Sequence, residues 1–311
     1  MLQHKHLIDI DEYSADEIVE ILDTARSFKE VNDRAIKKLP TLRGRTIINL
    51  FLEPSTRTRT SFEIAGKRLS GDVINFSASS SSAPKGEALA DTAETLDAMN
   101  CDLIVVRSKQ EGAPRILTQH MDAHVVNGGD GKHQHPTQAL LDAFTIRETL
   151  GHIDGLKVGI VGDIAHSRVV GSLVPLLKIM GAEPIVIGPP TLMPARPDIL
   201  GARCSNTLDD VLPELDVVYM LRIQKERLES AALPSLREYA MLYGINLARM
   251  DAMKNEAIIM HPGPINRGVE LSADAADSDR AVILDQVNSG VAVRMAVMYL
   301  LLGGEGNGAA A

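Results

Sequence analysis

The sequence predicts an α/β protein with two doubly wound, parallel-sheet lobes joined by a helix. Short apolar runs alternate with helical patterns along most of the chain, which is typical of parallel sheets covered on both faces. Its 311 residues suffice for two domains of ordinary size. Pro136–Leu150 has a helical pattern that Gly151 ends, and it is expected to connect the lobes. Ligands of open α/β sheets bind at the carboxyl ends of the strands, so we expect the active site in the cleft between the lobes.

The first half begins with a helix whose start is a capping box, with Ser14 as the cap and Glu17 three residues later. Apolar runs then predict four strands: Thr46–Leu52, Val73–Phe76, Leu103–Val106 and His124–Val126. Helical patterns between them predict helices near Phe62–Leu69, Ala88–Met99 and Ala113–His120.

The second half repeats this alternation. Five strands are predicted: Lys157–Val161, Pro184–Ile187, Val217–Leu221, Ala257–Met260 and Ala281–Leu284. Ser167–Met180 is the clearest helix, and the last helix, Asn288–Leu302, is apolar on most sides. A helix apolar all round is buried, so we expect it to pack against the first lobe.

Composition narrows the class of protein. Hydrophobic residues make up 45% and charged residues 23% of the chain, as in soluble globular proteins. The net charge of −9 argues against nucleic acid as a partner. The two cysteines, Cys101 and Cys204, lie far apart, which favours a reduced, cytoplasmic protein. No apolar run approaches membrane-spanning length, and the first residues lack the apolar core of a signal peptide.

The segment Pro54–Glu63 (PSTRTRTSFE) concentrates hydroxyl and guanidinium groups where a strand passes into a helix. The first N–H groups of a helix lack internal partners, and the helix dipole is positive there. Serine and threonine donors with an arginine fork complete an anion site that best suits phosphate. The alternative is a simple Ser/Thr helix cap followed by solvated arginines.

Further polar side chains follow other predicted strands. Arg107 ends the third strand, and His135 and Gln138 lie three apart at a helix start. Arg168 begins a second helix, and Arg222 follows the strand Val217–Leu221. One arginine at a strand end is usually solvated, but several at the carboxyl ends of strands predict a site for anions.

Patterns for metals and common cofactors are incomplete. Gly159–Asp163 resembles the start of a dinucleotide fingerprint, but Ile164, Ala165 and His166 replace its later glycines. His133 and His135 have no accompanying cluster of carboxylates or cysteines, so no metal is predicted. Neither a phosphate loop nor a G-x-S-x-G elbow occurs. The expected chemistry therefore uses arginine, histidine and hydroxyl groups without a cofactor.

The serine-rich segment Ser77–Lys85 (SASSSSAPK) contains few apolar residues. It is predicted to be a surface loop, and its terminal lysine also suits closure over an anionic ligand.

Taken in order along the chain, these motifs resemble a known family. The matching motifs are Pro54–Arg59, Lys85–Glu87, Arg107, His135–Gln138, Gly162–Asp163 with Ser167–Arg168, Arg222–Arg227 and His261–Pro264. The chain resembles the catalytic chains of aspartate carbamoyltransferases from about Leu7 to Leu302. The resemblance implies transfer of the carbamoyl group of carbamoyl phosphate to L-aspartate, in de novo pyrimidine synthesis and without a cofactor.

The resemblance also implies a role for each matching residue. Carbamoyl phosphate would be bound by Ser55, Thr56, Arg57, Thr58, Arg107, His135 and Gln138, by the backbone at Pro262 and Gly263, and by Ser81 and Lys85. Catalysis would depend on Arg57, Thr58, Arg107 and His135. Aspartate would be bound by Lys85, Arg168, Arg222 and Gln224. Ser81 and Lys85 would come from a neighbouring subunit, so the implied assembly is a homotrimer with shared sites.

The implied domains are residues 1–136 with 291–311 for carbamoyl phosphate, and residues 137–290 for aspartate. The family's best-known bacterial pattern has two lysines where Pro84 precedes Lys85 here, so Ser82 is the alternative to Ser81. The segment His261–Gly268 is similar to a subgroup whose trimers lack a zinc-bearing regulatory chain. Some of that subgroup associate with dihydroorotase, so both kinds of partner stay open.

Three other functions fit the sequence less well. Ornithine carbamoyltransferases share the phosphate motif but usually carry cysteine where Pro262 stands, and Arg168 and Arg222 suit a dicarboxylate better than a cation. A non-catalytic assembly partner would have lost substrate contacts, yet all are present. A two-lobed periplasmic binding protein would need a signal peptide.

Overall fold

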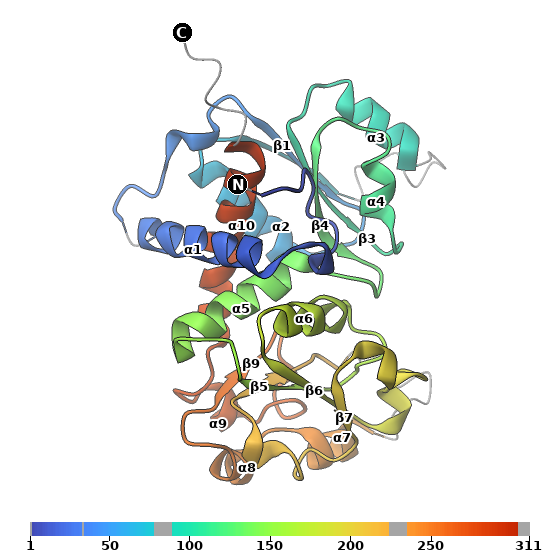
Figure 1. Ribbon diagram of the computed structural model, residues 1–311, viewed down its shortest axis with the longest axis vertical. Helices are drawn as coiled ribbons and strands as arrows, with labels where there is room; N and C mark the ends of the chain where they lie inside the picture. Colours follow the sequence, from blue (N-terminus) through green and yellow to red (C-terminus); the bar gives the residue numbers. More distant parts are fainter. Residues whose placement is uncertain (1, 33, 78–88, 224–234, 304–311) are drawn as a thin grey trace. The chain divides into compact units, whose positions relative to one another are not determined.

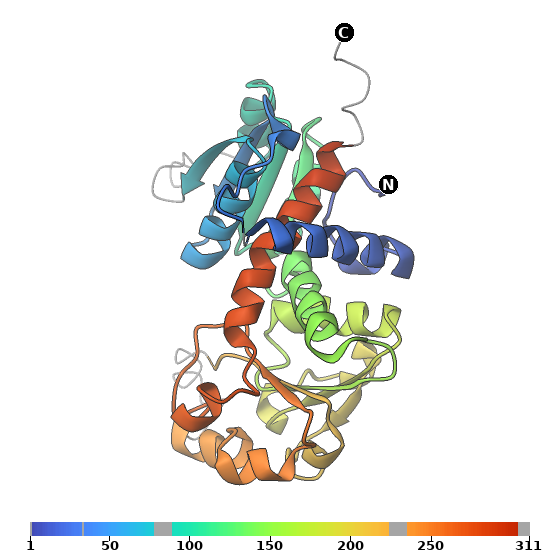
Figure 2. The same cartoon turned by 90° about the vertical axis from the view of Figure 1, so that its left-hand side faces the viewer.

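The computed structural model describes residues 2–32, 34–77, 89–223 and 235–303 (Figures 1 and 2). The chain forms two compact units. The first comprises Met1–Phe144, Gly171–Leu173 and Asn288–Ala311, and the second comprises Thr145–Val170 and Val174–Val287. Each unit contains one sheet in which every strand pair is parallel, as the alternating pattern predicts.

The first sheet has four strands in the order β2-β1-β3-β4. Their bounds are β1 Thr46–Phe51, β2 Asp72–Ser77, β3 Leu103–Ser108 and β4 His124–Asp130. β1 and β3 are central neighbours, and the chain leaves them toward opposite edges of the sheet. The carboxyl ends of such a pair form a topological switch point, where open α/β sheets bind ligands. Phe51 pairs with Arg107 there, which places Arg107 beside the loop that leaves β1.

Helices cover both faces of the first sheet (Figure 1). α3 (Leu89–Asp97) and α4 (Ala113–Leu117) lie on one face, where Leu96 and Leu117 join the core with Ile104 of β3. The helices of the other face are α1 (Ala15–Asn32), α2 (Thr56–Arg68), the first part of α5 (Pro136–Leu150) and the greater part of α10 (Ile283–Leu302). Phe28 of α1 packs edge-on against Tyr299 of α10, with ring centroids 5.6 Å apart.

The predicted capping box starts α1. Ser14 Oγ accepts from the Glu17 N–H at 3.3 Å, and Glu17 Oε2 accepts from the Ser14 N–H at 3.0 Å. These reciprocal bonds satisfy two backbone donors at the start of the helix.

The second sheet has five strands in the order β7-β6-β5-β8-β9. Their bounds are β5 Lys157–Val161, β6 Glu183–Ile187, β7 Arg203–Ser205, β8 Val217–Met220 and β9 Ile258–Met260. Its switch point lies between β5 and β8, where Val161 pairs with Met220. Figure 1 shows α6 (Arg168–Ile179) on one face, with α7 (Leu236–Tyr243) and α8 (Leu247–Ala252) on the other. The short α9 spans Ala273–Ala276.

Two details of the second half differ from the prediction. The strand expected at Ala281–Leu284 is wrong, because α10 begins at Ile283 and only Ala281 bridges to Ile259. Its apolar run was too short to distinguish a strand from the first turn of a buried helix. The edge strand β7 was not predicted, because three residues give no periodicity to detect.

Candidate functional site

The start of α2 leaves its hydroxyl groups uncommitted to capping. Ser55 is the N-cap residue, yet its side chain makes no capping hydrogen bond. Five other helices with a serine or asparagine cap do use the cap side chain, namely α1, α6, α7, α8 and α9. The first N–H groups of α2 and the Ser55 hydroxyl can therefore serve an anion, as the sequence predicts for this strand-to-helix passage. This favours the anion site over the simple helix cap.

Arg107 lies at the switch point of the first sheet, between a backbone carbonyl group and a glutamate side chain. Its Nη1 donates to the Gly128 carbonyl at 3.0 Å, and its Nη2 lies 3.7 Å from Glu53 Oε1. The Glu53 side chain has an exposed fraction of 18%, so this ion pair is partly screened. The carbonyl and the carboxylate together fix the direction of the guanidinium.

A second arginine lies behind this site. Arg294 of α10 is buried, and its guanidinium lies 4.9 Å from the centroid of the Phe62 ring on α2. Burial lowers the pKa of Arg294 to about 10; the Asp142 carboxylate raises it and the Arg107 guanidinium lowers it. Asp142 and Arg107 thus act on the pKa of Arg294 in opposite directions.

His135 is held at the N-terminal end of α5, where it is only 4% exposed. Ser172 Oγ accepts from the His135 N–H at 3.4 Å and donates to the His135 carbonyl at 3.2 Å. Gly171, beside Ser172, has no room for a side chain, because a Cβ there would lie 1.9 Å from the His133 carbonyl oxygen. The segment before His135 is therefore fixed by direct backbone contact.

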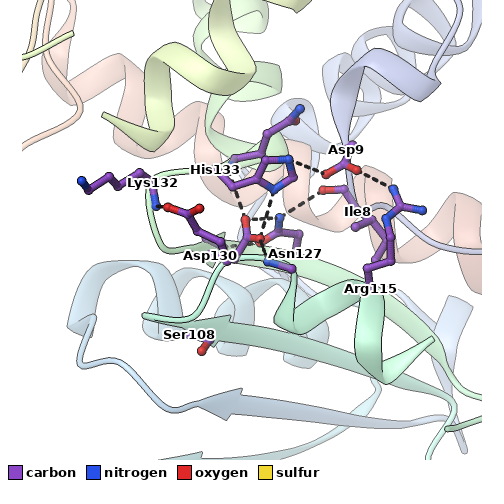
Figure 3. Close-up of polar contacts among 12 residues, drawn as sticks. Ile8, Asp9, Ser108, Arg115, Asn127, Asp130, Lys132 and His133 are labelled. Atoms are coloured by element: carbon purple, nitrogen blue, oxygen red, sulfur yellow. Dashed lines mark hydrogen bonds and ion pairs between the residues drawn. The ribbon is translucent and has the colours of Figure 1, made fainter. Parts of the chain in front are cut away.

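A buried carboxylate organises the turn that leads to His135 (Figure 3). Asp130 ends β4 and is fully buried. Its Oδ1 accepts from Asn127 Nδ2 at 2.8 Å and from the Gln134 N–H at 3.1 Å. Its Oδ2 accepts from the Gly112 N–H at 2.8 Å and lies 3.1 Å from His133 Nδ1. Both oxygens of one side chain thus tie the ends of the turn together.

The same turn is tied to the N-terminal segment. Gln134 Oε1 accepts from the Ile10 N–H at 2.8 Å, and Gln134 Nε2 donates to Asp11 Oδ1 at 2.9 Å. Figure 3 shows the His133 ring also facing Asp9, which pairs with Arg115 of α4. Residues far apart in sequence therefore hold the turn from both sides.

The second unit presents its own polar group at the β5/β8 switch point. Gly162 follows β5 with φ at +139°, and a Cβ there would lie 2.9 Å from Leu221 Cβ. Asp163 is buried, and its Oδ1 lies 2.7 Å from His166 Nδ1. Ser167 caps α6, so Arg168 is its first helical residue and is partly exposed.

Arg222 follows β8 and is exposed, while the backbone of the next residue, Ile223, is held by hydrogen bonds. The Ile223 N–H donates to Glu270 Oε1 at 2.7 Å, and Asn266 Nδ2 donates to the Ile223 carbonyl at 2.9 Å. Glu270 is fully buried, and this burial raises its pKa. Its Oε2 lies 3.8 Å from His261 Nε2. Glu270 thereby connects the end of β8 with the segment that follows β9.

That segment contains Pro262 and Gly263, whose backbone groups are predicted to bind the substrate. His261 Nδ1 accepts from the Gly263 N–H at 2.7 Å, and Gln286 Oε1 accepts from the His261 N–H at 2.9 Å. Gly263 has φ at +65°, which favours glycine. The backbone is therefore held in a defined turn.

The predicted site residues divide between the two units. Ser55, Thr56, Arg57, Thr58, Arg107, His135 and Gln138 belong to the first unit, and Arg168, Arg222, Pro262 and Gly263 to the second. Each residue lies at the carboxyl end of a strand of its own sheet or within eight residues after it. Ser81, Ser82, Lys85 and Gln224 lie outside the described residues.

Sequence reasoning missed the acids that support these residues. Glu53, Asp130, Asp142 and Glu270 were not singled out. Each is in contact with, or directly connected to, a segment bearing a predicted ligand. A detectable signal existed for three of them, because Glu53, Asp130 and Asp142 lie within five residues of a predicted site residue.

Among the described residues, no three or more His, Cys, Asp or Glu side chains gather as a metal site would require. None of the helices described is long and apolar enough to cross a membrane.

Comparisons with known proteins cover nearly the whole chain. Residues 5–148 match the family described as aspartate/ornithine carbamoyltransferase, carbamoyl-P binding domain. Residues 154–301 match the Asp/Orn binding domain of the same family. The aspartate carbamoyltransferase catalytic subunit of Syntrophotalea carbinolica is 57% identical over 97% of this chain and 96% of its own. The same subunit of Thermobifida fusca is 56% identical over 96% of each chain.

Solved structures that are similar to this chain are also carbamoyltransferases. Aspartate transcarbamoylase from Trypanosoma cruzi, in complex with carbamoyl phosphate and aspartate, is 35% identical with a TM-score of 0.85, covering 94% of this chain and 95% of that one. Ornithine carbamoyltransferase from Pyrococcus furiosus is 30% identical, also with a TM-score of 0.85, covering 96% and 97%.

Proposed function

Because the chain belongs to the aspartate/ornithine carbamoyltransferase family, we propose that it transfers the carbamoyl group of carbamoyl phosphate to L-aspartate. The products are N-carbamoyl-L-aspartate and phosphate, and the reaction serves de novo pyrimidine synthesis. The observation that carries the proposal is the uncommitted N-terminus of α2, where Ser55 does not cap the helix and Arg107 lies at the same switch point.

The first unit binds carbamoyl phosphate in this proposal. Ser55, Thr56, Arg57 and Thr58 bind the phosphate through hydroxyl, guanidinium and backbone N–H groups. Arg107 bridges the phosphate and the carbonyl oxygen. The proposed boundaries are residues 1–136 with 291–311 for this domain and 137–290 for the aspartate domain.

Catalysis follows from the charge that develops during the reaction. Attack of the aspartate amine on the carbamoyl carbon builds negative charge on the carbonyl oxygen. Thr58, Arg107 and His135 donate to that oxygen and stabilise the transition state more than the ground state. Losing one such donor typically raises the barrier by about 2.7–4 kcal/mol. The departing phosphate accepts the amine proton, so the site needs no separate general base.

The second unit binds aspartate. Arg168 takes the α-carboxylate, and Arg222 with Gln224 takes the side-chain carboxylate, since the planar guanidinium fork matches a carboxylate. A cationic ornithine side chain would be repelled by the same arginines. Aspartate is therefore the proposed acceptor, in agreement with the names of the relatives at 52–57% identity.

The proposal extends to assembly. Ser81 (or Ser82) and Lys85 reach into the site of a neighbouring subunit, which makes a homotrimer the smallest active form. Lys85 contacts both substrates there. Association with a dihydroorotase or a regulatory chain stays open, and a cytoplasmic location stays a prediction.

The test is carbamoylation by the purified chain, with L-aspartate and L-ornithine offered in parallel. We expect product from aspartate alone and none from Arg57→Ala, whose folding should be intact because Arg57 is exposed. Product from ornithine would overturn the roles of Arg168 and Arg222. No product from either acceptor, or full activity in Arg57→Ala, would contradict the proposed reaction or the phosphate role.

A further inference from the structure

Gln138 and Asp142 lie one turn apart on α5, where side chains at positions i and i+4 are neighbours. Gln138 Nε2 donates to Asp142 Oδ1 at 3.0 Å. Gln138 is partly exposed, whereas Asp142 is fully buried. The partly exposed Gln138 side chain is therefore held by an acid that is shielded from water.

This contact decides which end of the amide can face a ligand. An amide has two donors on nitrogen and an acceptor on oxygen, and an ionised carboxylate only accepts. The Gln138 nitrogen must therefore face Asp142, because the opposite orientation would bring two acceptors together. Consequently the amide oxygen is the group left to meet a ligand, and it can bind only a donor.

The negative charge of Asp142 has a counter-charge in the same unit. Arg294 is buried, interacts electrostatically with Asp142, and stacks on Phe62 of α2. A buried carboxylate near a buried guanidinium is far less costly than an isolated one. The contact between Gln138 Nε2 and the Asp142 carboxylate therefore holds the amide in one orientation.

We propose that Asp142 is a positioning residue that orients Gln138, so that the site selects the amino group of carbamoyl phosphate over the methyl group of acetyl phosphate. The inference rests on the proposed function. The two acyl phosphates have nearly the same shape and carry the same phosphate. Only the amino group donates a hydrogen bond, so the oriented amide oxygen distinguishes them.

The test compares Asp142→Asn, Gln138→Ala and the double variant. For each, the KM of carbamoyl phosphate is measured at saturating aspartate, with the inhibition constants of acetyl phosphate and inorganic phosphate. In Asp142→Asn we expect the KM of carbamoyl phosphate to rise about tenfold, as for one lost hydrogen bond. The two inhibition constants should change less than twofold. The double variant should resemble Gln138→Ala, because Asp142 acts through Gln138.

Other outcomes separate the hypotheses. Equal weakening of all three ligands in Asp142→Asn, or additive losses in the double variant, would show a merely structural role and overturn the inference. If Asp142→Asn fails to fold because Arg294 loses its counter-charge, Asp142→Asn/Arg294→Met removes both charges and gives the same comparison. Failure of the unaltered protein to form carbamoylaspartate would overturn the function itself, whereas an active protein with unchanged discrimination in the variants would overturn only the role of Asp142.

Discussion

Asp130 shows how one side chain can set the position of a reactive group five residues away. Its Oδ1 accepts from the Gln134 N–H, in the turn that ends at His135, and from Asn127 Nδ2, and its Oδ2 accepts from the Gly112 N–H. Asp130→Asn replaces one acceptor oxygen by a donor. We expect kcat to fall at least tenfold, while the affinity for carbamoyl phosphate measured by calorimetry changes less. The free energy of unfolding should decrease by about 1–3 kcal/mol.

The matched control is Lys132→Ala in the same turn, because its side chain is exposed and only its backbone N–H contacts Glu111. It should retain wild-type kcat and stability. Loss of stability in Asp130→Asn with an unchanged kcat would mean that the turn tolerates the change and that His135 does not depend on Asp130.

His6 makes the N-terminal segment sensitive to acid. Its Nδ1 accepts from the Val125 N–H at 3.1 Å, which requires the neutral ring. Burial lowers its pKa to about 4, helped by the charges of Lys5, His124 and Arg115 and opposed by Glu12. Because the folded pKa lies below the unfolded value of about 6.5, the stabilisation is fully present above pH 6.5 and is lost as pH falls toward 4.

The measurement is the thermal unfolding midpoint between pH 7 and pH 5, where most carboxylates do not yet titrate. We expect the wild-type midpoint to decrease over this range more steeply than that of His6→Asn, which keeps an acceptor but does not titrate. Parallel slopes in the two proteins would rule out His6 as the source of the pH dependence.

Two helix starts that look alike in sequence have different uses. Ser55 precedes α2 without capping it, whereas Ser167 caps α6 by accepting from the Val170 N–H at 3.4 Å. Ser55→Ala should therefore leave the free energy of unfolding within about 0.5 kcal/mol of wild type and weaken phosphate binding. Ser167→Ala should lose about 1 kcal/mol of stability.

Urea unfolding and phosphate calorimetry on both variants provide the comparison. The reverse pattern, with stability lost at Ser55 and phosphate affinity unaffected, would mean that Ser55 is an ordinary cap. The anion site would then have to be built by the arginines alone.

For the whole molecule, the proposed sharing of sites between subunits predicts complementation. Arg57→Ala chains lack a residue of their own active site. Lys85→Ala chains lack the residue that they contribute to the active site of a neighbouring subunit. A mixed trimer can contain one site with both residues intact. We expect activity to reappear after chain exchange and in no unmixed sample, and its absence after verified exchange would argue for self-contained sites.

Much of this protein was determined by local sequence. Apolar runs and helical periodicity fixed two parallel-sheet units, and the capping box at Ser14 and Glu17 was correctly predicted, because such signals lie within one turn or one strand. The seven ligands proposed in the first unit were singled out from the sequence because polar side chains cluster after predicted strands, and their binding roles stay predictions. The short strand β7 and the start of α10 were not predicted, because each has too few residues for periodicity to distinguish a strand from a helix.

The long-range contacts of the supporting acids were decided by tertiary structure alone. Nothing local reveals that Asp130 meets Gly112, or that Glu270 reaches Ile223, 47 residues away. A buried carboxylate is stable only where distant donors converge on it, and the fold brings those donors together. The sequence therefore pointed to the side chains that are proposed to meet the substrates, whereas the packed structure decided how each is oriented, because orientation depends on contacts between residues that are far apart in the chain.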